Sequence, residues 1–227
     1  MKAMILSAGR GERMRPLTDH CPKPLIKVKN SALIEYHILA LKKAGIKEIV
    51  INHAWLGKQI EEYLGDGRRW NIQIHYSAEK KPLETAGGII KALPILTSES
   101  NHFIVVNGDV FTDYDFTALV NLNTQSLAHL LMIKNPEHHL QGDFYLNNGM
   151  LSSDTNSEDN TQEKFTYSGI GLFHVDLFKG LSIEKRALAP ILINAMKKTQ
   201  VSGEVYSGLW SDVGTIERLK KLEKMLS

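Results

Sequence analysis

The first half of the chain alternates short apolar runs with segments of helical periodicity, and this alternation constrains the fold more than any other feature. The apolar runs are rich in β-branched and aromatic residues, which favour strands; they lie at residues 3–6, 48–51, 72–76 and 103–106. The segments between and after them predict helices at 31–45, 55–64, 85–93 and 115–123. We therefore expect a Rossmann-like α/β fold, with a mostly parallel sheet and helices on both faces. Ligands of such sheets bind at the carboxyl ends of the strands.

The helix expected at 31–45 shows how the pattern is read. Its apolar residues share one helical face: Leu33, Ile34, Ile38, Leu41 and Ala44. Asn30 or Ser31 can cap its start, and Gly45 can end it.

The second half of the chain predicts a small β-rich lobe. Strand-like pieces follow one another at 128–133, 143–146 and 165–173, and the polar segment 152–163 reads as a hairpin excursion between the last two. Further elements are expected: a helix at 187–198, a strand at 200–206 and a final helix at 215–226. Because no linker interrupts the chain, residues 1–227 are expected to form a single domain.

Charge and cysteine content exclude several kinds of partner. The 27 Lys and Arg against 25 Asp and Glu leave a net charge of +2, too balanced to indicate a nucleic-acid partner. No apolar run approaches the ~20 residues that span a bilayer, so no membrane partner is expected. Cys21 stands alone, which rules out an intrachain disulfide and favours the cytoplasm.

The segment SAGRGERMRP, residues 7–16, follows the first predicted strand and has the composition of a phosphate cradle. Gly9 and Gly11 leave backbone amides open to a ligand, and Arg13 and Arg15 add positive charge. The P-loop pattern GxxxxGK[ST] is absent, and Met14 stands where a dinucleotide fingerprint has its third glycine. Two glycines alone are equally compatible with a tight turn that binds nothing.

Lys23 is the residue that strengthens the phosphate interpretation. It stands between Pro22 and Pro24, whose rings fix the backbone, ~10 residues after the glycines. So stiff a backbone is typical of a lysine whose ammonium group is held in position for a ligand, rather than of one that is merely exposed to solvent.

Four ordered motifs resemble those of the sugar-1-phosphate nucleotidyltransferase family. They are SAGRGERMRPLT with PKPLI, PLETAGGI at 82–89, VNGDV at 106–110 and WSDVGT at 210–215. The resemblance implies the nucleotide-diphospho-sugar transferase fold, with a nucleotide-binding part at about 1–125 and a sugar-phosphate-binding part at about 126–227. It also implies attack by a sugar 1-phosphate on the α-phosphorus of a nucleoside triphosphate, with Mg²⁺ as cofactor.

Three further segments resemble one branch of that family in particular. They are NHAWLG at 52–57, NGDVFTDYDF at 107–116 and NPEHHLQGDF at 135–144. That branch transfers UMP from UTP to N-acetylmuramic acid 1-phosphate (MurNAc 1-phosphate) during peptidoglycan recycling. The opening motif also resembles mannose-1-phosphate guanylyltransferases, which stay an alternative. A non-catalytic nucleotide-sugar sensor or regulatory subunit would have lost one of the catalytic or metal-binding residues, and all are intact.

The family resemblance assigns roles to individual residues. The expected catalytic residues are Arg13, Lys23 and Asp109, and the expected metal ligands are Asp109 and Asp212. The expected nucleotide-binding residues are Ala8, Gly9, Gly11, Glu12, Arg13, Lys23, Glu79 and Gly88. The expected sugar-phosphate-binding residues are Asn107, Gly142, Asp143, Ser168 and Gly169.

The sequence departs from the family pattern at two places. Glu84 stands where many relatives have glycine, and Glu163 with Lys164 lacks the proline that follows this pair elsewhere, so the roles of Glu84 and Glu163 stay open. His138 and His139 are adjacent in a polar loop, which is more typical of exposed histidines than of metal ligands.

Overall fold

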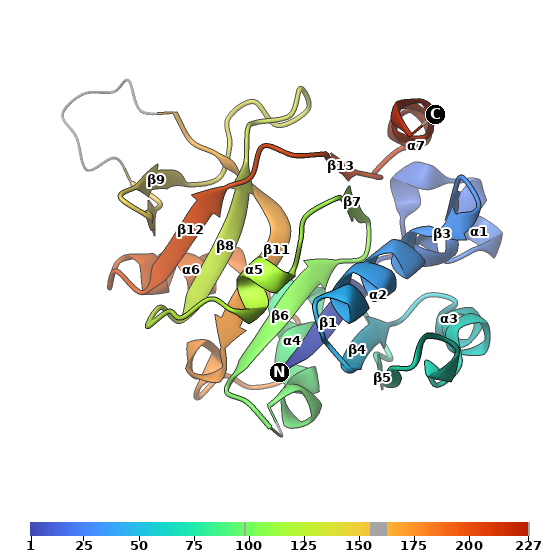
Figure 1. The fold of residues 1–227 in the computed structure, drawn as a ribbon, viewed down its shortest axis with the longest axis horizontal. Coiled ribbons are helices and arrows are strands. Elements are labelled where there is room, and N and C mark those ends of the chain that lie inside the picture. Colours follow the sequence, from blue (N-terminus) through green and yellow to red (C-terminus); the bar gives the residue numbers. More distant parts are fainter. Residues whose placement is uncertain (98, 155–162, 227) are drawn as a thin grey trace.

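The computed structural model describes residues 1–97, 99–154 and 163–226. One nine-stranded sheet runs through these residues in the order β5-β4-β1-β6-β11-β8-β12-β10-β9 (Figure 1). Its first four strands are parallel: β5 (Gln73–Ala78), β4 (Glu48–His53), β1 (Lys2–Ser7) and β6 (His102–Asn107).

The second half of the sheet is mixed. β11 (Thr166–His174) lies antiparallel to both β6 and β8 (Ala128–Ile133), and β12 (Val201–Val205) returns parallel to β8. The edge is an antiparallel hairpin of β9 (Tyr145–Asn147) and β10 (Met150–Ser152). The expected mixed, mostly parallel sheet is confirmed.

Helices cover both faces of the sheet, as the alternation predicts, because strand residues point alternately to the two sides. One face packs against α2 (Leu33–Lys43), α3 (Gly57–Leu64) and α5 (Thr117–Val120). The other packs against α4 (Glu84–Leu96), η4 (Val175–Phe178) and α6 (Ala189–Met196). Short turns and strands complete the first fifty residues: η1 (Glu12–Met14), α1 (Leu17–His20), η2 (Lys23–Leu25), β2 (Lys27–Val28) and β3 (Ser31–Ala32). The turn η3 (Arg68–Trp70) precedes β5.

A two-stranded ribbon stands outside the main sheet. β7 (Val110–Thr112), directly after β6, pairs antiparallel with β13 (Trp210–Asp212), and α7 (Ile216–Met225) follows (Figure 1). The sequence does not predict this ribbon, because each strand is only three residues long.

Two other expectations need correction. The start of α2 is not capped by Asn30 or Ser31; instead the backbone N–H of Ala32 donates to Oε2 of Glu35, at 2.8 Å. Gly45 does end the helix, with φ +87°.

The strand predicted at 143–146 lies two residues too early: its second half belongs to β9, and Phe144 forms only an isolated bridge with Phe165. The two residues between β9 and β10, Asn148 and Gly149, both have positive φ, so this is the tight hairpin turn that an Asn-Gly pair favours. Of the excursion predicted at 152–163, residues 155–162 lie outside the described residues.

No helix in the described parts of the chain has the length and apolar character needed to span a membrane.

Candidate active site

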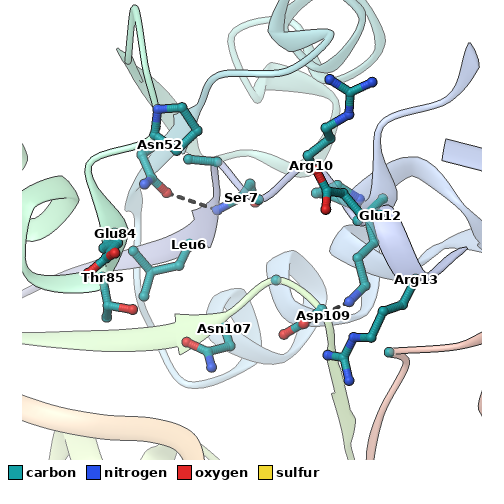
Figure 2. Close-up of a pocket in the computed structure, with 18 residues that line it drawn as sticks. Leu6, Ser7, Arg10, Glu12, Arg13, Asn52, Glu84, Thr85, Asn107 and Asp109 are labelled. Atoms are coloured by element: carbon teal, nitrogen blue, oxygen red, sulfur yellow. Dashed lines mark hydrogen bonds and ion pairs between the residues drawn. The ribbon is translucent and has the colours of Figure 1, made fainter. Parts of the chain in front are cut away.

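A cavity of about 550 Å³ opens at the carboxyl edge of the parallel strands. Eight of the residues expected to form the site line it: Ala8, Gly9, Gly11, Glu12, Arg13, Lys23, Asn107 and Asp109. Figure 2 shows Glu84 and Thr85 at one end of the cavity and Arg13 and Asp109 at the other. A cavity therefore lies at the edge of the sheet that the strand–helix alternation predicts.

The loop after β1 forms one wall of the cavity through its two glycines. A Cβ on Gly9 would meet no protein atom within 4 Å, so this backbone faces open space. Gly11 has φ +70°, and a Cβ there would lie 2.9 Å from Cγ2 of Thr18. The Thr18 hydroxyl donates to the Gly11 carbonyl at 2.8 Å and fixes the turn. The exposed Arg13 follows on η1, beside the cavity.

Lys23 and Asp109 form an ion pair inside the cavity, with Nζ 2.7 Å from Oδ2. Lys23 is 8% exposed and begins η2, where Pro22 and Pro24 hold its backbone. The adjacent Gly108 approaches β1 so closely that a Cβ would lie 2.8 Å from the Leu6 carbonyl. The lysine that the sequence picks out is thus buried, rigid and directed at the predicted metal ligand.

A buried polar network supports the opposite end of the cavity. Oδ1 of Asn52 accepts from the Ser7 N–H at 2.8 Å, and Nδ2 of Asn52 donates to Oε1 of Glu79 at 2.7 Å. Oε2 of Glu79 accepts from the Leu83 N–H at 2.8 Å. A Cβ on Gly88 would lie 2.8 Å from both Asn52 and Glu79. Glu79 and Gly88 do not line the cavity; they hold the β5–α4 connection against β4.

Asn107 and Gly169 meet at the third side, where β6 pairs with β11. Gly169 has φ +80°, and a Cβ there would lie 2.5 Å from Nδ2 of Asn107, so only glycine fits. Ser168 is buried, its Oγ accepts from the Ile170 N–H at 3.2 Å, and its carbonyl accepts from the Trp210 indole at 3.0 Å. Of the expected sugar-binding residues, Asn107 lines the cavity, and Gly169 does not line it but packs against Asn107.

Gly142 and Asp143 lie in the loop before β9 and do not line the cavity. Asp143 accepts from the Tyr167 N–H at 2.8 Å, and its other oxygen lies 3.0 Å from Nε2 of His139. Gly142 has φ +60°, and a Cβ there would lie 2.7 Å from Oδ1 of Asn135. Both residues tie this loop to the start of β11.

Asp212 reaches the site through the β7–β13 ribbon, in which it pairs with Val110, next to Asp109. The Val213 N–H donates to the Asp109 carbonyl at 2.7 Å. The Asp212 carboxylate is ion-paired with Arg218 of α7, and its Oδ1 lies 3.2 Å from Nε2 of His138. The two aspartates therefore come together although they are far apart in sequence, and His138 joins Asp212, which the sequence does not predict.

The two carboxylates fit a magnesium ion in donor type, since Mg²⁺ prefers one or two protein carboxylates beside phosphate oxygens and waters. Oδ1 of Asp109 has no hydrogen-bond partner among the described residues, whereas Asp212 is shared with Arg218 and His138. No group of three or more His, Cys, Asp or Glu side chains in the described ranges has the arrangement of a complete metal site. A cation here would complete its coordination with substrate oxygens and water.

His37 is a buried residue next to the site that the sequence analysis did not single out. It is 1% exposed on α2, and burial lowers its pKa to about 4, while a hydrogen bond to the Val110 backbone and the charge of Asp109 oppose this shift. It occupies the apolar helical face together with Ile34 and Ile38, so the same periodicity could have found it.

Arg10 and Trp55 form a second pair that the sequence did not reveal. The Arg10 guanidinium stacks over the Trp55 ring at 4.2 Å and lines the cavity, and the Trp55 indole donates to the Thr18 carbonyl at 3.0 Å. This pair links the loop after β1 to the loop after β4.

Glu84 lines the cavity at the start of α4 with φ +59°, a left-handed conformation. That region disfavours residues with a Cβ, which gives a physical reason for glycine at this position in relatives. Its carboxylate lies 3.3 Å from Nζ of Lys185 on the surface. Glu163, by contrast, is exposed and does not line the cavity.

The family model described as nucleotidyl transferase matches residues 2–144, and the chain belongs to this family. The resemblance to sugar-1-phosphate nucleotidyltransferases that the motifs predict is confirmed. The chain is 49% identical over 231 residues to the N-acetylmuramate alpha-1-phosphate uridylyltransferase of Neisseria meningitidis serogroup B, covering 99% of this chain and 98% of that protein.

Other relatives match over less of their length. The chain is 26% identical over 220 residues to the mannose-1-phosphate guanylyltransferase catalytic subunit beta of Xenopus tropicalis, covering 94% of this chain and 61% of the relative. Among solved structures, a Bacillus anthracis protein assigned as a glucose-1-phosphate thymidylyltransferase superposes with a TM-score of 0.87 at 21% identity, covering 99% of this chain and 94% of the other. That similarity confirms the expected fold.

Proposed function

We propose that this chain transfers UMP from UTP to MurNAc 1-phosphate, giving UDP-MurNAc and pyrophosphate in peptidoglycan recycling. The observation that carries the proposal is the 49% identity, over nearly the whole of both chains, to a uridylyltransferase of that specificity. The guanylyltransferase from Xenopus tropicalis is 26% identical and extends well beyond the matched region.

The chemistry of this reaction determines which kinds of residue the site needs. A phosphate monoester has its second pKa near ~6, so the attacking sugar phosphate is already largely an anion at pH 7. The reaction therefore needs no general base and no Ser or Cys nucleophile. Its obstacle is the repulsion between two polyanions and the charge that grows on the departing pyrophosphate, so catalysis is positioning and charge neutralisation.

The residues of the cavity supply that neutralisation. Lys23 spends one of its three N–H donors on Asp109 and has the others for oxygens near the α-phosphorus. Arg13 and the amides of Ala8, Gly9 and Gly11 serve the triphosphate, beside Glu12.

The remaining positions divide between the two substrates. Asn107, packed on Gly169, donates to the sugar hydroxyls. Glu79 and Gly88 act on the nucleotide by holding the wall near Glu84, and Gly142, Asp143 and Ser168 act on the sugar by holding β11. In this proposal about residues 1–125 bind the nucleotide and about 126–227 the sugar phosphate.

Mg²⁺ is the proposed cofactor, and Asp109 and Asp212 are the residues that would hold it. When bound, it would supply positive charge that neutralises substrate phosphate oxygens. The proposed compartment is the cytoplasm, because the lone Cys21 fits a reducing environment.

A substrate panel tests the proposal. Pyrophosphate release is measured for UTP and GTP, each with MurNAc, N-acetylglucosamine and mannose 1-phosphates. We expect UTP with MurNAc 1-phosphate to give the highest kcat/KM, exceeding N-acetylglucosamine 1-phosphate by roughly tenfold. MurNAc carries a lactyl group with a carboxylate, which N-acetylglucosamine lacks. A site that binds this carboxylate would leave its hydrogen-bond donors unpaired when N-acetylglucosamine 1-phosphate is bound. If GTP with mannose 1-phosphate is fastest, the uridylyltransferase proposal fails and the guanylyltransferase alternative replaces it.

The metal proposal has its own test. Asp109→Asn and Asp212→Asn should each fold but lose roughly 10²-fold or more in kcat, because an electrostatic element at the phosphates is gone. Asp115→Asn, an exposed aspartate outside the cavity, is the control. A near-normal rate in either variant at saturating Mg²⁺ removes that aspartate from the metal site.

A further inference from the structure

A second cavity, of about 350 Å³, lies under α6 and has no part in the site described above. Its walls come from η4, from the connection 179–188 between η4 and α6, from α6 itself and from the residues just before β8 and β12. Residues 182–188 of that connection are named the strap. Leu127, just before β8, lines it.

The register of the sheet places this cavity at the opposite edge from the active site. The first residue of β8, Ala128, pairs with Phe173 of β11, which pairs with Phe103 at the beginning of β6. The active-site cavity is at the other end of β6, at Asn107. A molecule in the second cavity would therefore not touch the substrates.

The lining of the second cavity combines positive charge with an apolar floor. Three basic side chains and one acidic side chain line it: Lys179, Arg186, Lys198 and Asp176. Both lysines are exposed and have no ion-pair partner among the described residues. The Arg186 guanidinium is ion-paired through Nη2 with Glu184 of the strap, but its Nε is buried without a hydrogen-bond acceptor. The amides of Asn194 and Gln200 add polar groups, and the apolar residues are Leu127, Leu177, Leu181, Pro190, Ile191 and Ala195.

This composition selects a class of ligand. A phosphate group satisfies several cationic donors at once, and charge-assisted hydrogen bonds of this kind are the strong ones. An apolar floor adds contact area for the body of an organic molecule. A free inorganic anion would leave that floor unused.

The strap connects the second cavity to the nucleotide end of the active site through the backbone of Arg186. The Arg186 N–H donates to the Leu83 carbonyl at 2.9 Å, and its carbonyl accepts from the N–H groups of Ala86 and Gly87 at 3.0 and 3.2 Å. A Cβ on Gly87 would lie 2.2 Å from the Glu184 carbonyl, so α4 and the strap are in direct backbone contact. Pro82, Glu84 and Thr85 of the same turn line the active-site cavity.

We infer that the second cavity binds a small organic molecule carrying a phosphate group, and that its occupancy changes how the active site binds the nucleotide. Contact between the bound phosphate group and the Arg186 side chain fixes the strap. The strap in turn fixes the turn at Leu83–Ala86, which forms one wall of the active-site cavity. The regulatory half of this inference rests on the proposed function; the binding half does not.

Binding is tested directly, without turnover, by isothermal titration calorimetry of the full chain with phenyl phosphate. Inorganic phosphate and phenol serve as ligand controls, because each has only half of the required chemistry. We expect a Kd of about 1 mM or tighter for phenyl phosphate, weaker binding of both controls, and about tenfold weaker binding to Lys179→Gln/Lys198→Gln. The matched control is Lys58→Gln/Lys220→Gln, two exposed lysines outside the cavity with the same loss of charge.

A variant of the active site separates the two places where a phosphate can bind. Lys23→Ala should bind phenyl phosphate as the unaltered chain does. The inference is overturned if phenyl phosphate does not bind at about 10 mM, if Lys179→Gln/Lys198→Gln binds it normally, or if Lys23→Ala loses it.

The regulatory half is tested by the KM for UTP with and without phenyl phosphate. We expect a change of about twofold or more in the unaltered chain and none in Lys179→Gln/Lys198→Gln. An unchanged KM at saturating phenyl phosphate overturns the coupling. A chain inactive on every substrate pair would sink the proposed function and leave the binding result standing.

Discussion

Replacing Glu79 distinguishes a residue that reads the base from one that holds the cavity wall. Both oxygens of this buried carboxylate are used, one by Nδ2 of Asn52 and one by the Leu83 N–H. A buried donor left without an acceptor costs roughly 1–3 kcal/mol, so Glu79→Ala, which affects two donors, should lower the free energy of unfolding by roughly 2–6 kcal/mol. In Glu79→Gln the amide oxygen serves one donor and its NH₂ faces the other, so about half that loss is expected.

Thermal unfolding is the measurement for both variants. In a domain of this length 1 kcal/mol corresponds to roughly 2–4 °C in Tm, so Glu79→Ala should lose at least about 4 °C and Glu79→Gln about half as much. The control Glu62→Ala, on the exposed side of α3, should leave Tm unchanged. The positioning role predicts a raised KM for UTP and GTP alike. Normal Tm in Glu79→Ala, together with a changed ratio of kcat/KM between UTP and GTP, would refute this reasoning and make Glu79 a base-reading residue.

Three further predictions concern residues in or beside the cavity. Lys23→Ala should lower kcat roughly 10²-fold with little change in the KM for UTP. The control is Arg15→Ala, which should keep its rate because the Arg15 side chain is paired with Asp19 outside the cavity. A change confined to the KM for UTP would make Lys23 a ground-state phosphate ligand. Burial lowers the pKa of His37 from 6.5 to about 4, so the unfolded chain takes up the proton first and acidification from pH 6.5 to 4 should cost about 3 kcal/mol of stability. Stability measured against pH should fall less steeply in His37→Gln, and an equal slope would contradict this. Glu84→Gly should raise Tm by roughly 1–4 °C by removing left-handed strain, and an equal rise in Glu84→Ala, which keeps the Cβ, would rule that cause out.

The sequence predicts the parallel half of the sheet well because each of its strands is marked locally. The apolar run before Ser7 and the glycine after α2 are signals carried by neighbouring residues, and both hold in the structure. The turn at Asn148 and Gly149 is marked just as locally by its Asn-Gly pair, although the predictions above do not include it.

The candidate site was predicted as a set of residues but not as a set of pairs. Lys23 and Asp109 are 86 positions apart, and no periodicity indicates that one side chain lies on the other. The same holds for Arg10 over Trp55 and for Arg218 on Asp212, which depend on how separate loops pack. Motifs name the residues of a site, whereas contacts between motifs follow only from the tertiary structure.

The β7–β13 ribbon bears on the order in which a newly made chain acquires its parts. All nine strands of the main sheet lie before Tyr206, and β13 follows them, so none of the strand pairs of the sheet depends on the ribbon. Asp212 reaches Asp109 only when β13 adds to β7, a closure between distant parts of the chain that local structure does not assist. The main sheet can therefore form before Asp109 and Asp212 lie side by side, so in a folding chain the proposed metal site is completed after the sheet.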